Sequence, residues 1–265
     1  HGLLRRQRQM CIRDRACFSG LNMNIGFTDM PYAMSDAIPN LRLAASKLPM
    51  HIATGAFRAP CYNSHAFMVE SFIDECAVAA GKDSLDYRLQ LLHGWDPAWS
   101  YCLQVTADKS GWGERLPKGQ GRGIAISNWP HSGIKQAGTT CCAAAHVEVS
   151  PEGALKIHRI DFAFDCGRIV NRDAVMAQLE GGIIYGLNMS LNEGLTLRDG
   201  EIVESNFHDL PMLKMKDIPD IRIHFEALSG HDRFSMLGEA PVGPIGPAIA
   251  NAIYQATGQR LRSTP

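Results

Sequence analysis

One predicted helix, residues 172–191, constrains this chain more than any other feature, because three glycines lie in its interior. Its apolar face is formed by four residues at helical spacing, Val175, Leu179, Ile183 and Leu187. The interior glycines are Gly181, Gly182 and Gly186. Each costs a helix about 1 kcal/mol relative to alanine. We therefore expect another backbone or a ligand to approach this helix closely.

The chain takes on strand character from Gly121 onwards. Residues 143–149 and 155–164 flank the turn Ser150-Pro151-Glu152-Gly153, which predicts a hairpin. A shift in the apolar pattern predicts a β-bulge near His158-Arg159. A second hairpin is expected to turn at Asp199-Gly200. Because strands and helices interleave without a regular βαβ repeat, we predict an α+β fold.

Four further helices are predicted, one of them a short helix followed by a loop within residues 95–119. The first follows the turn at Pro60, with an apolar stripe formed by Val69, Phe72, Ile73, Cys76 and Ala80. Asp83 is expected to cap the second, which ends near Gly94. The last begins near Pro247 and stops at Gly258.

Composition excludes several functional classes. The formal net charge is −1 over 265 residues, so no electrostatic footprint for nucleic acid is visible. The longest apolar stretch is far shorter than the ~20 residues that a membrane helix needs. The 8 cysteines form no C-x-x-C pair, and zinc ribbons, thioredoxin chemistry and Cys-ligated iron–sulfur clusters therefore have no signature here.

The N-terminus carries a foreign-looking run. Met10-Cys11-Ile12-Arg13-Asp14-Arg15 matches the translated end sequence of a transposon used in preparing sequencing libraries. We expect residues 1–15 to be non-native and the natural protein to continue upstream. Residues 16–120 are predicted to form a helical part of a larger region, and residues 121–265 an α+β domain.

Three segments hold residues whose types suit a chemical site. In the first, Gly55-Ala56-Phe57-Arg58-Ala59-Pro60, a glycine-hinged turn presents an arginine and backbone N–H groups, which suits an anionic cofactor. An ordinary surface ion pair is the alternative for Arg58.

In the second segment, Asp165–Leu187, the Gln178 amide offers both donors and an acceptor. Bridging of neighbouring backbone is the alternative for Gln178.

The third segment, Leu237–Ile253, places Glu239 in a turn stiffened by glycine and proline among apolar residues. Such surroundings predict desolvation, which raises the pKa of a carboxyl toward the operating pH of a general base. The alternative is an acid that is stabilised by the dipole of the following helix.

Together the three segments resemble the molybdenum hydroxylase superfamily of xanthine dehydrogenases and aldehyde oxidases. They match its G-x-[FW]-R turn, its Q-x-E-G-[GA] helix and its ending G-E-x-x-x-x-P-x-x-P-A-[IV]-A-N-A-[IL]. The segment from Asn206 to Met215 adds a supporting match. The resemblance covers residues 26–265 and is strongest to the branch of isoquinoline 1-oxidoreductase, nicotinate dehydrogenase and membrane-associated aldehyde dehydrogenases.

The resemblance implies that the chain is the C-terminal portion of the cofactor-binding domains of a large subunit like that of xanthine dehydrogenase. It implies Glu239 as the catalytic base, with no protein ligand to the metal. The cofactor-binding residues that it implies are Gly55, Phe57, Arg58, Ala59, Gln178 and Gly238.

The implied activity is hydroxylation of an aldehyde or an N-heteroaromatic carbon with oxygen from water. The implied cofactor is molybdopterin cytosine dinucleotide, and electrons leave through 2Fe-2S clusters on a small partner subunit and, in this branch, a cytochrome c subunit. A periplasmic location with membrane association through partners is favoured over a cytoplasmic one.

The sequence departs from the branch at Cys61-Tyr62, where Gly-His is usual, and this puts the local pocket shape in doubt. The family's upstream G-G-G-F-G loop is also missing, so we expect this part of the protein to be inactive alone. Two other functions stay open. One is a cofactor-free homologue that serves as an assembly surface, and the other is a small-molecule binding domain without redox chemistry.

Overall fold

The computed structural model of the chain describes residues 40, 57–60, 62–94, 96–131, 134–225 and 234–264. Residues 1–15 and Gly55 lie outside these ranges. A four-stranded sheet in the order β1-β2-β3-β6 forms the centre. Its strands are β1 (Gln120–His131), β2 (Ile134–Val149), β3 (Leu155–Asp165) and β6 (Asp220–His224). β1, β2 and β3 pair antiparallel, and β6 joins β3 in parallel.

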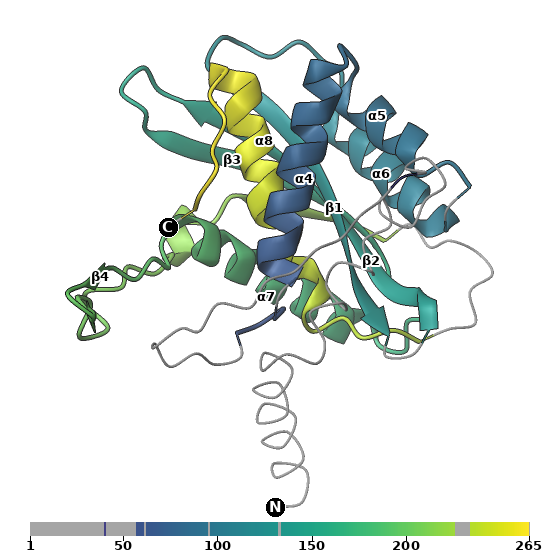
Figure 1. Cartoon of the computed structure of the whole chain (residues 1–265). Coiled ribbons are helices and arrows are strands. Elements are labelled where there is room, and N and C mark those ends of the chain that lie inside the picture. The colour runs from purple at the N-terminus through teal and green to yellow at the C-terminus, as the bar shows by residue number, and fades with distance from the viewer. Residues whose placement is uncertain are drawn as a thin grey trace, which may run out of the picture.

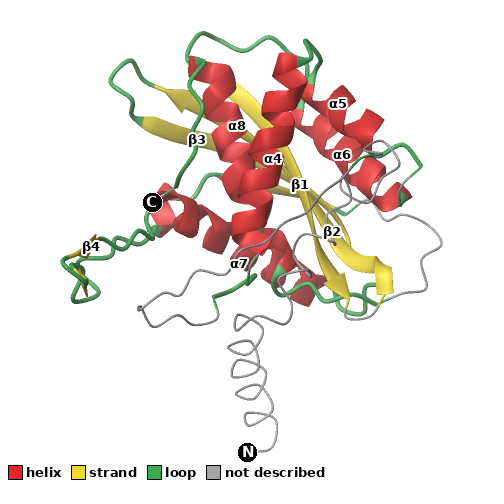
Figure 2. Cartoon of the chain, in the orientation of Figure 1, coloured by secondary structure: helices red, strands yellow, loops and turns green. Residues whose placement is uncertain are grey.

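Helices cover the sheet, and the described chain has the predicted α+β architecture (Figures 1 and 2). The helices are α4 (Tyr62–Ala79), α5 (Ser84–Leu91), α6 (Pro97–Ser110), α7 (Arg172–Leu191) and α8 (Ile245–Thr257). Successive strand residues point to opposite faces. One face of the sheet packs against α7 and α8, and the other contributes to a second core with α4, α5 and α6. Among the described helices, none is long and apolar enough to cross a bilayer.

Most of the local predictions are confirmed. α7 spans the predicted residues, and its N-cap Asn171 accepts from the Ala174 backbone. β2 and β3 form the predicted hairpin, and the pairing skips His158, which is the predicted bulge. Asp199 and Gly200 have φ angles of 52° and 85° between the two-residue strands β4 (Leu197–Arg198) and β5 (Glu201–Ile202). Asp83 caps α5 through its side chain.

The predicted buried stripe of α4 is wrong. Of its five residues only Ile73 is buried, and Phe72 is 62% exposed. The face that the helix buries instead contains Ala66, Glu70, Ser71, Ile73, Asp74 and Ala77. The reason is electrostatic, because arginines from outside the helix neutralise the two acids.

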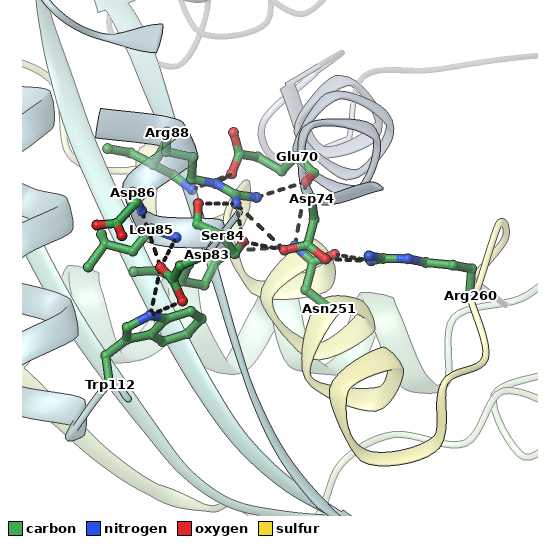
Figure 3. A network of polar contacts seen from close by, with 12 residues as sticks. Glu70, Asp74, Asp83, Ser84, Leu85, Asp86, Arg88, Trp112, Asn251 and Arg260 are labelled. Atoms are coloured by element: carbon green, nitrogen blue, oxygen red, sulfur yellow. Dashed lines mark hydrogen bonds and ion pairs between the residues drawn. The ribbon is translucent and has the colours of Figure 1, made fainter. Parts of the chain in front are cut away.

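These arginines belong to a polar network between helices and sheet (Figure 3). The Nε of Arg88, on α5, donates to Glu70 Oε2 at 2.9 Å, and its Nη2 donates to the Glu70 carbonyl at 2.9 Å. Arg260 lies 2.6 Å from Asp74 Oδ2 and also donates to the Asn251 side chain. Asn251, on α8, donates to the Ile124 carbonyl of β1 at 3.2 Å. The network therefore ties α4 to α5, α8 and the sheet.

Glycines let α8 approach the sheet closely. A Cβ on Gly121 or Gly123 of β1 would lie 2.1 or 2.2 Å from the backbone of Ala252. Small residues on both sides therefore bring helix and strand into backbone contact. α4 and α8 consequently run side by side over one edge of the sheet (Figure 1).

The approach predicted from the glycines of α7 is confirmed at two of them. A Cβ on Gly182 would lie 2.7 Å from Pro241, which is in the short 3-10 helix η3 (Ala240–Val242). A Cβ on Gly186 would lie 3.0 Å from Ile245 at the start of α8. A Cβ on Gly181 would meet nothing within 4 Å. α7 is thus pressed against the segment that follows Glu239.

Candidate functional site

Three segments that are distant in sequence meet at one end of α4, α7 and α8. The Nε of Arg58 donates to the Gly238 carbonyl at 2.7 Å, and its Nη2 donates to Gln178 Oε1 at 3.4 Å. The Ala59 N–H donates to Glu239 Oε1 at 3.2 Å. The turn before α4, the exposed face of α7 and the turn before α8 therefore form a single cluster.

Backbone geometry at Ala59 directs this contact. Ala59 has a φ of 62°, in the left-handed region that costs a residue with a Cβ about 1 kcal/mol or more. In this conformation its N–H faces Glu239, and its carbonyl accepts from the Asn63 N–H at 3.2 Å in the first turn of α4. Strain of this kind persists where the surroundings fix the backbone, and it gathers at functional sites.

The environment of Glu239 agrees only in part with the expected desolvation. The residue is half-buried, and it comes directly before η3 without capping that helix through its side chain. Its described partner is an N–H from a segment 180 positions away. A donated N–H stabilises the ionised carboxylate, which is the form that accepts a proton. The contact with Ala59 gives the carboxylate a fixed direction, which the helix-dipole alternative does not require.

Arg58 is oriented by neutral groups. Its described hydrogen bonds go to a carbonyl and a side-chain amide, not to a carboxylate. An ordinary surface ion pair is therefore not what holds it in the described part of the chain. An arginine held by neutral acceptors keeps its charge for an anionic ligand.

Glycine at position 238 keeps the space beside Gln178 open. A Cβ there would lie 3.8 Å from Gln178 Oε1, and Gly238 is itself exposed. Gly243, further along the same segment, would place a Cβ 2.6 Å from Ser127 Oγ on β1. The segment thus presents Gly238 and Glu239 at the surface and packs its later residues against the sheet.

Sequence reasoning assigned no role to Tyr185. The Arg58 guanidinium carbon lies 5.5 Å from the centre of the Tyr185 ring, and the Phe57 and Tyr185 rings are 5.3 Å apart. Burial and the charge of Glu193 raise the pKa of Tyr185, against the opposing effects of the Arg58 backbone and charge. Helical periodicity could have indicated Tyr185 from the sequence, because it lies two helical turns after Gln178 on the same face of α7.

The departure at Cys61-Tyr62 affects the packing beside the site. Tyr62 begins α4, and its ring lies 4.8 Å from that of Trp129. Trp129 belongs to β1 and packs partly against the core. Cys61 lies outside the described residues. Tyr62 therefore joins the packing between α4 and the sheet edge.

Taken together, the cluster offers one carboxylate, one guanidinium, one amide and an oriented backbone N–H. Among the described residues, no group of three or more His, Cys, Asp or Glu side chains could hold a metal ion. The cluster is suited to holding an anionic ligand and to accepting a proton beside it.

Comparison with known proteins agrees with a site for an anionic cofactor. The family model for the molybdopterin cofactor-binding domain matches residues 119–219. The chain is 34% identical over 200 residues to isoquinoline 1-oxidoreductase subunit beta of Brevundimonas diminuta. This alignment covers 75% of this chain and 25% of that protein. It is 32% identical over 211 residues to the membrane-bound aldehyde dehydrogenase [pyrroloquinoline-quinone] of Gluconacetobacter polyoxogenes, covering 74% of this chain and 27% of that protein. The chain thus spans about a quarter of the length of these relatives.

The fold has a counterpart among solved structures. The aldehyde oxidoreductase of Desulfovibrio desulfuricans superposes with a TM-score of 0.61 at 16% identity, covering 80% of this chain and 40% of that one. At this identity the likeness concerns the fold alone. The family model, the two relatives and this fold agree, and the chain belongs to the molybdenum hydroxylase superfamily of xanthine dehydrogenases and aldehyde oxidases, as part of its molybdopterin cofactor-binding subunit.

Proposed function

We propose that this chain carries the catalytic base of a molybdenum-dependent hydroxylase, and that the base is Glu239. The observation that carries the proposal is the meeting of Arg58, Gln178 and Glu239 through contacts of 2.7 to 3.4 Å. These contacts bring the three segments that carry the family's motifs to one place. In this proposal Glu239 accepts a proton from the water-derived oxygen that is added to the substrate.

The described residues fit the cofactor of the family. Arg58 supplies positive charge, Gln178 supplies an exposed amide, and Gly238 leaves space beside that amide. We propose that these residues, together with Phe57, Ala59 and Gly55, hold molybdopterin in its cytosine dinucleotide form. When bound, the cofactor provides the metal and accepts two electrons from the substrate carbon. The protein orients the groups and moves the proton.

Substrate and partners are inferred from the relatives. One relative is named for isoquinoline and the other for aldehydes. We propose an aldehyde or an N-heteroaromatic compound as substrate, a small 2Fe-2S subunit as electron acceptor and a cytochrome c subunit beyond it. We propose a periplasmic site with membrane attachment through partners, and the relative named as membrane-bound supports the membrane association. Residues 16–120 and 121–265 would both belong to the cofactor-binding region.

Replacement of the base tests the proposal. In the complete natural complex, Glu239→Gln removes the proton acceptor and keeps the shape, so turnover should fall about 100-fold or more. Molybdenum and pterin content should stay at the level of the wild type. Glu180→Gln is the matched control, because Glu180 is an exposed acid on α7 that is expected to keep full turnover.

Other outcomes identify other functions. Near-normal turnover of Glu239→Gln would remove Glu239 as the base. A wild-type complex without molybdenum or pterin would favour a cofactor-free assembly role, and bound quinone in their place would favour the cofactor named for the membrane-bound relative. Tight binding of substrate by this chain alone, without redox turnover of the complex, would favour a binding domain.

A further inference from the structure

We propose that Tyr185 is a positioning residue that holds Arg58 in the orientation needed for binding the cofactor. This inference rests on the proposed function. Arg58 lies in a short turn, and its long side chain has several rotatable bonds that must be fixed before the guanidinium can serve as a preformed anion site. The structure contains a group that restricts it.

That group is the aromatic ring of Tyr185. The guanidinium carbon of Arg58 lies 5.5 Å from the ring centroid, within the range of a cation–π contact. The Phe57 ring also lies 5.3 Å from the Tyr185 ring, with a tilt of 44° between the two planes. Tyr185 therefore contacts two successive residues of the turn and limits how the turn can rotate.

The position of Tyr185 on α7 makes this contact rigid. Its neighbour Gly186 packs against Ile245 and the Val242 carbonyl, and Leu187 is fully buried. Gln178 lies on the same face of the helix and accepts from Arg58 Nη2 at 3.4 Å. One helix thus provides both a ring for the guanidinium to stack on and an amide to accept its hydrogen bond. Arg58 Nε is then directed to the Gly238 carbonyl beside Glu239.

A second arginine–tyrosine pair provides a matched control. The guanidinium carbon of Arg260 lies 3.5 Å from the Tyr254 ring centroid at the far end of α8. This pair belongs to the side of the molecule with the buried network, away from Gln178 and Glu239. If the stacked tyrosines served only folding, removing either ring would change the cofactor content of the complex to the same extent.

The experiment measures molybdenum and pterin per subunit in the complete natural complex. Tyr185→Leu should lower both about fivefold, which is the scale of a lost cation–π contact. Tyr185→Phe keeps the ring and loses only the hydroxyl beside the Arg58 backbone, so it should retain more cofactor than Tyr185→Leu, and Tyr254→Leu should match the wild type. In an Arg58→Ala background, Tyr185→Leu should cause no further loss, because the residue acts through Arg58.

Each result decides between explanations. Wild-type cofactor content in Tyr185→Leu overturns the inference, and so does an equal additional loss in the Arg58→Ala background. If Tyr185→Leu fails to assemble, Tyr185→Met, with a side chain of similar length and no ring, takes its place with the same expectations. A wild-type complex without molybdenum contradicts the proposed function itself, whereas a loaded wild type with unaffected Tyr185 variants contradicts only this inference.

Discussion

Two arginines show how differently the middle of α4 and the turn before its N-terminus are used. Arg88 is 0% exposed and contacts the Glu70 carboxylate, the Glu70 carbonyl and the Ser84 carbonyl. Arg58, in the turn before α4, is half-buried and is held by one carbonyl, one amide and one aromatic ring. The first has its charge neutralised inside the protein, and the second keeps its charge at the surface.

This difference separates a group that stabilises the fold from one that is available to a ligand. A buried charge without its partner is strongly destabilising, so Arg88 and Glu70 depend on each other. A surface arginine with neutral partners contributes little to folding. The network along the middle of α4 and α8 therefore allows the turns before these helices to carry groups that the fold does not need.

The largest expected effect tests this contrast directly. Arg88→Ala leaves Glu70 buried without its cation and should cost about 3–5 kcal/mol of folding free energy. Arg58→Ala should cost less than about 1 kcal/mol, since its partners are solvent-accessible. Thermal unfolding of the purified cofactor-free subunit measures both, and the first variant should show the larger decrease in melting temperature. Equal losses in the two variants would contradict the division into two regions.

A pair of adjacent glycines gives a smaller and sharper test. Gly182→Ala places a Cβ 2.7 Å from Pro241, and overpacking of this kind costs about 1–3 kcal/mol. Gly181→Ala meets nothing within 4 Å and should stabilise α7 by about 1 kcal/mol.

Melting temperatures of the two variants should therefore move in opposite directions from that of the wild type. A decrease in both would mean that Gly181 is covered in the complete protein. The open side of α7 would then be a contact surface for another part of the complete protein.

The smallest effect concerns the strained turn. Ala59→Gly relieves the left-handed conformation, and the greater freedom of glycine in the unfolded chain offsets part of the gain. We expect a net stabilisation of about 0.5 kcal/mol, measured by urea titration. The N–H to Glu239 is retained, so turnover should stay within about twofold. A clear destabilisation would show that the methyl group of Ala59 has a packing role.

Much of the fold could be predicted from local patterns. Periodicity and caps located α7, the β2–β3 hairpin and its bulge, since each depends on residues close in sequence. The buried face of α4 could not be predicted in this way. Its acids are buried because Arg88 and Arg260 reach them from elsewhere, and apolar periodicity carries no information on such partners.

The site shows the same limit. Motifs pointed to Arg58, Gln178 and Glu239 separately, but no spacing rule places residues 180 positions apart within 3.2 Å. The left-handed conformation of Ala59 was also outside the reach of sequence, because an alanine gives no sign of positive φ.

The long sequence separation of the Ala59–Glu239 contact has a consequence for biosynthesis. A ribosome adds residues in order, so the turn at Ala59 waits for nearly the whole described chain before its partner emerges. Closing so long a loop is entropically costly until the intervening sheet has formed. Any factor that loads a prosthetic group here would therefore find the complete binding site only after this part of the chain has been synthesised and α8 has docked.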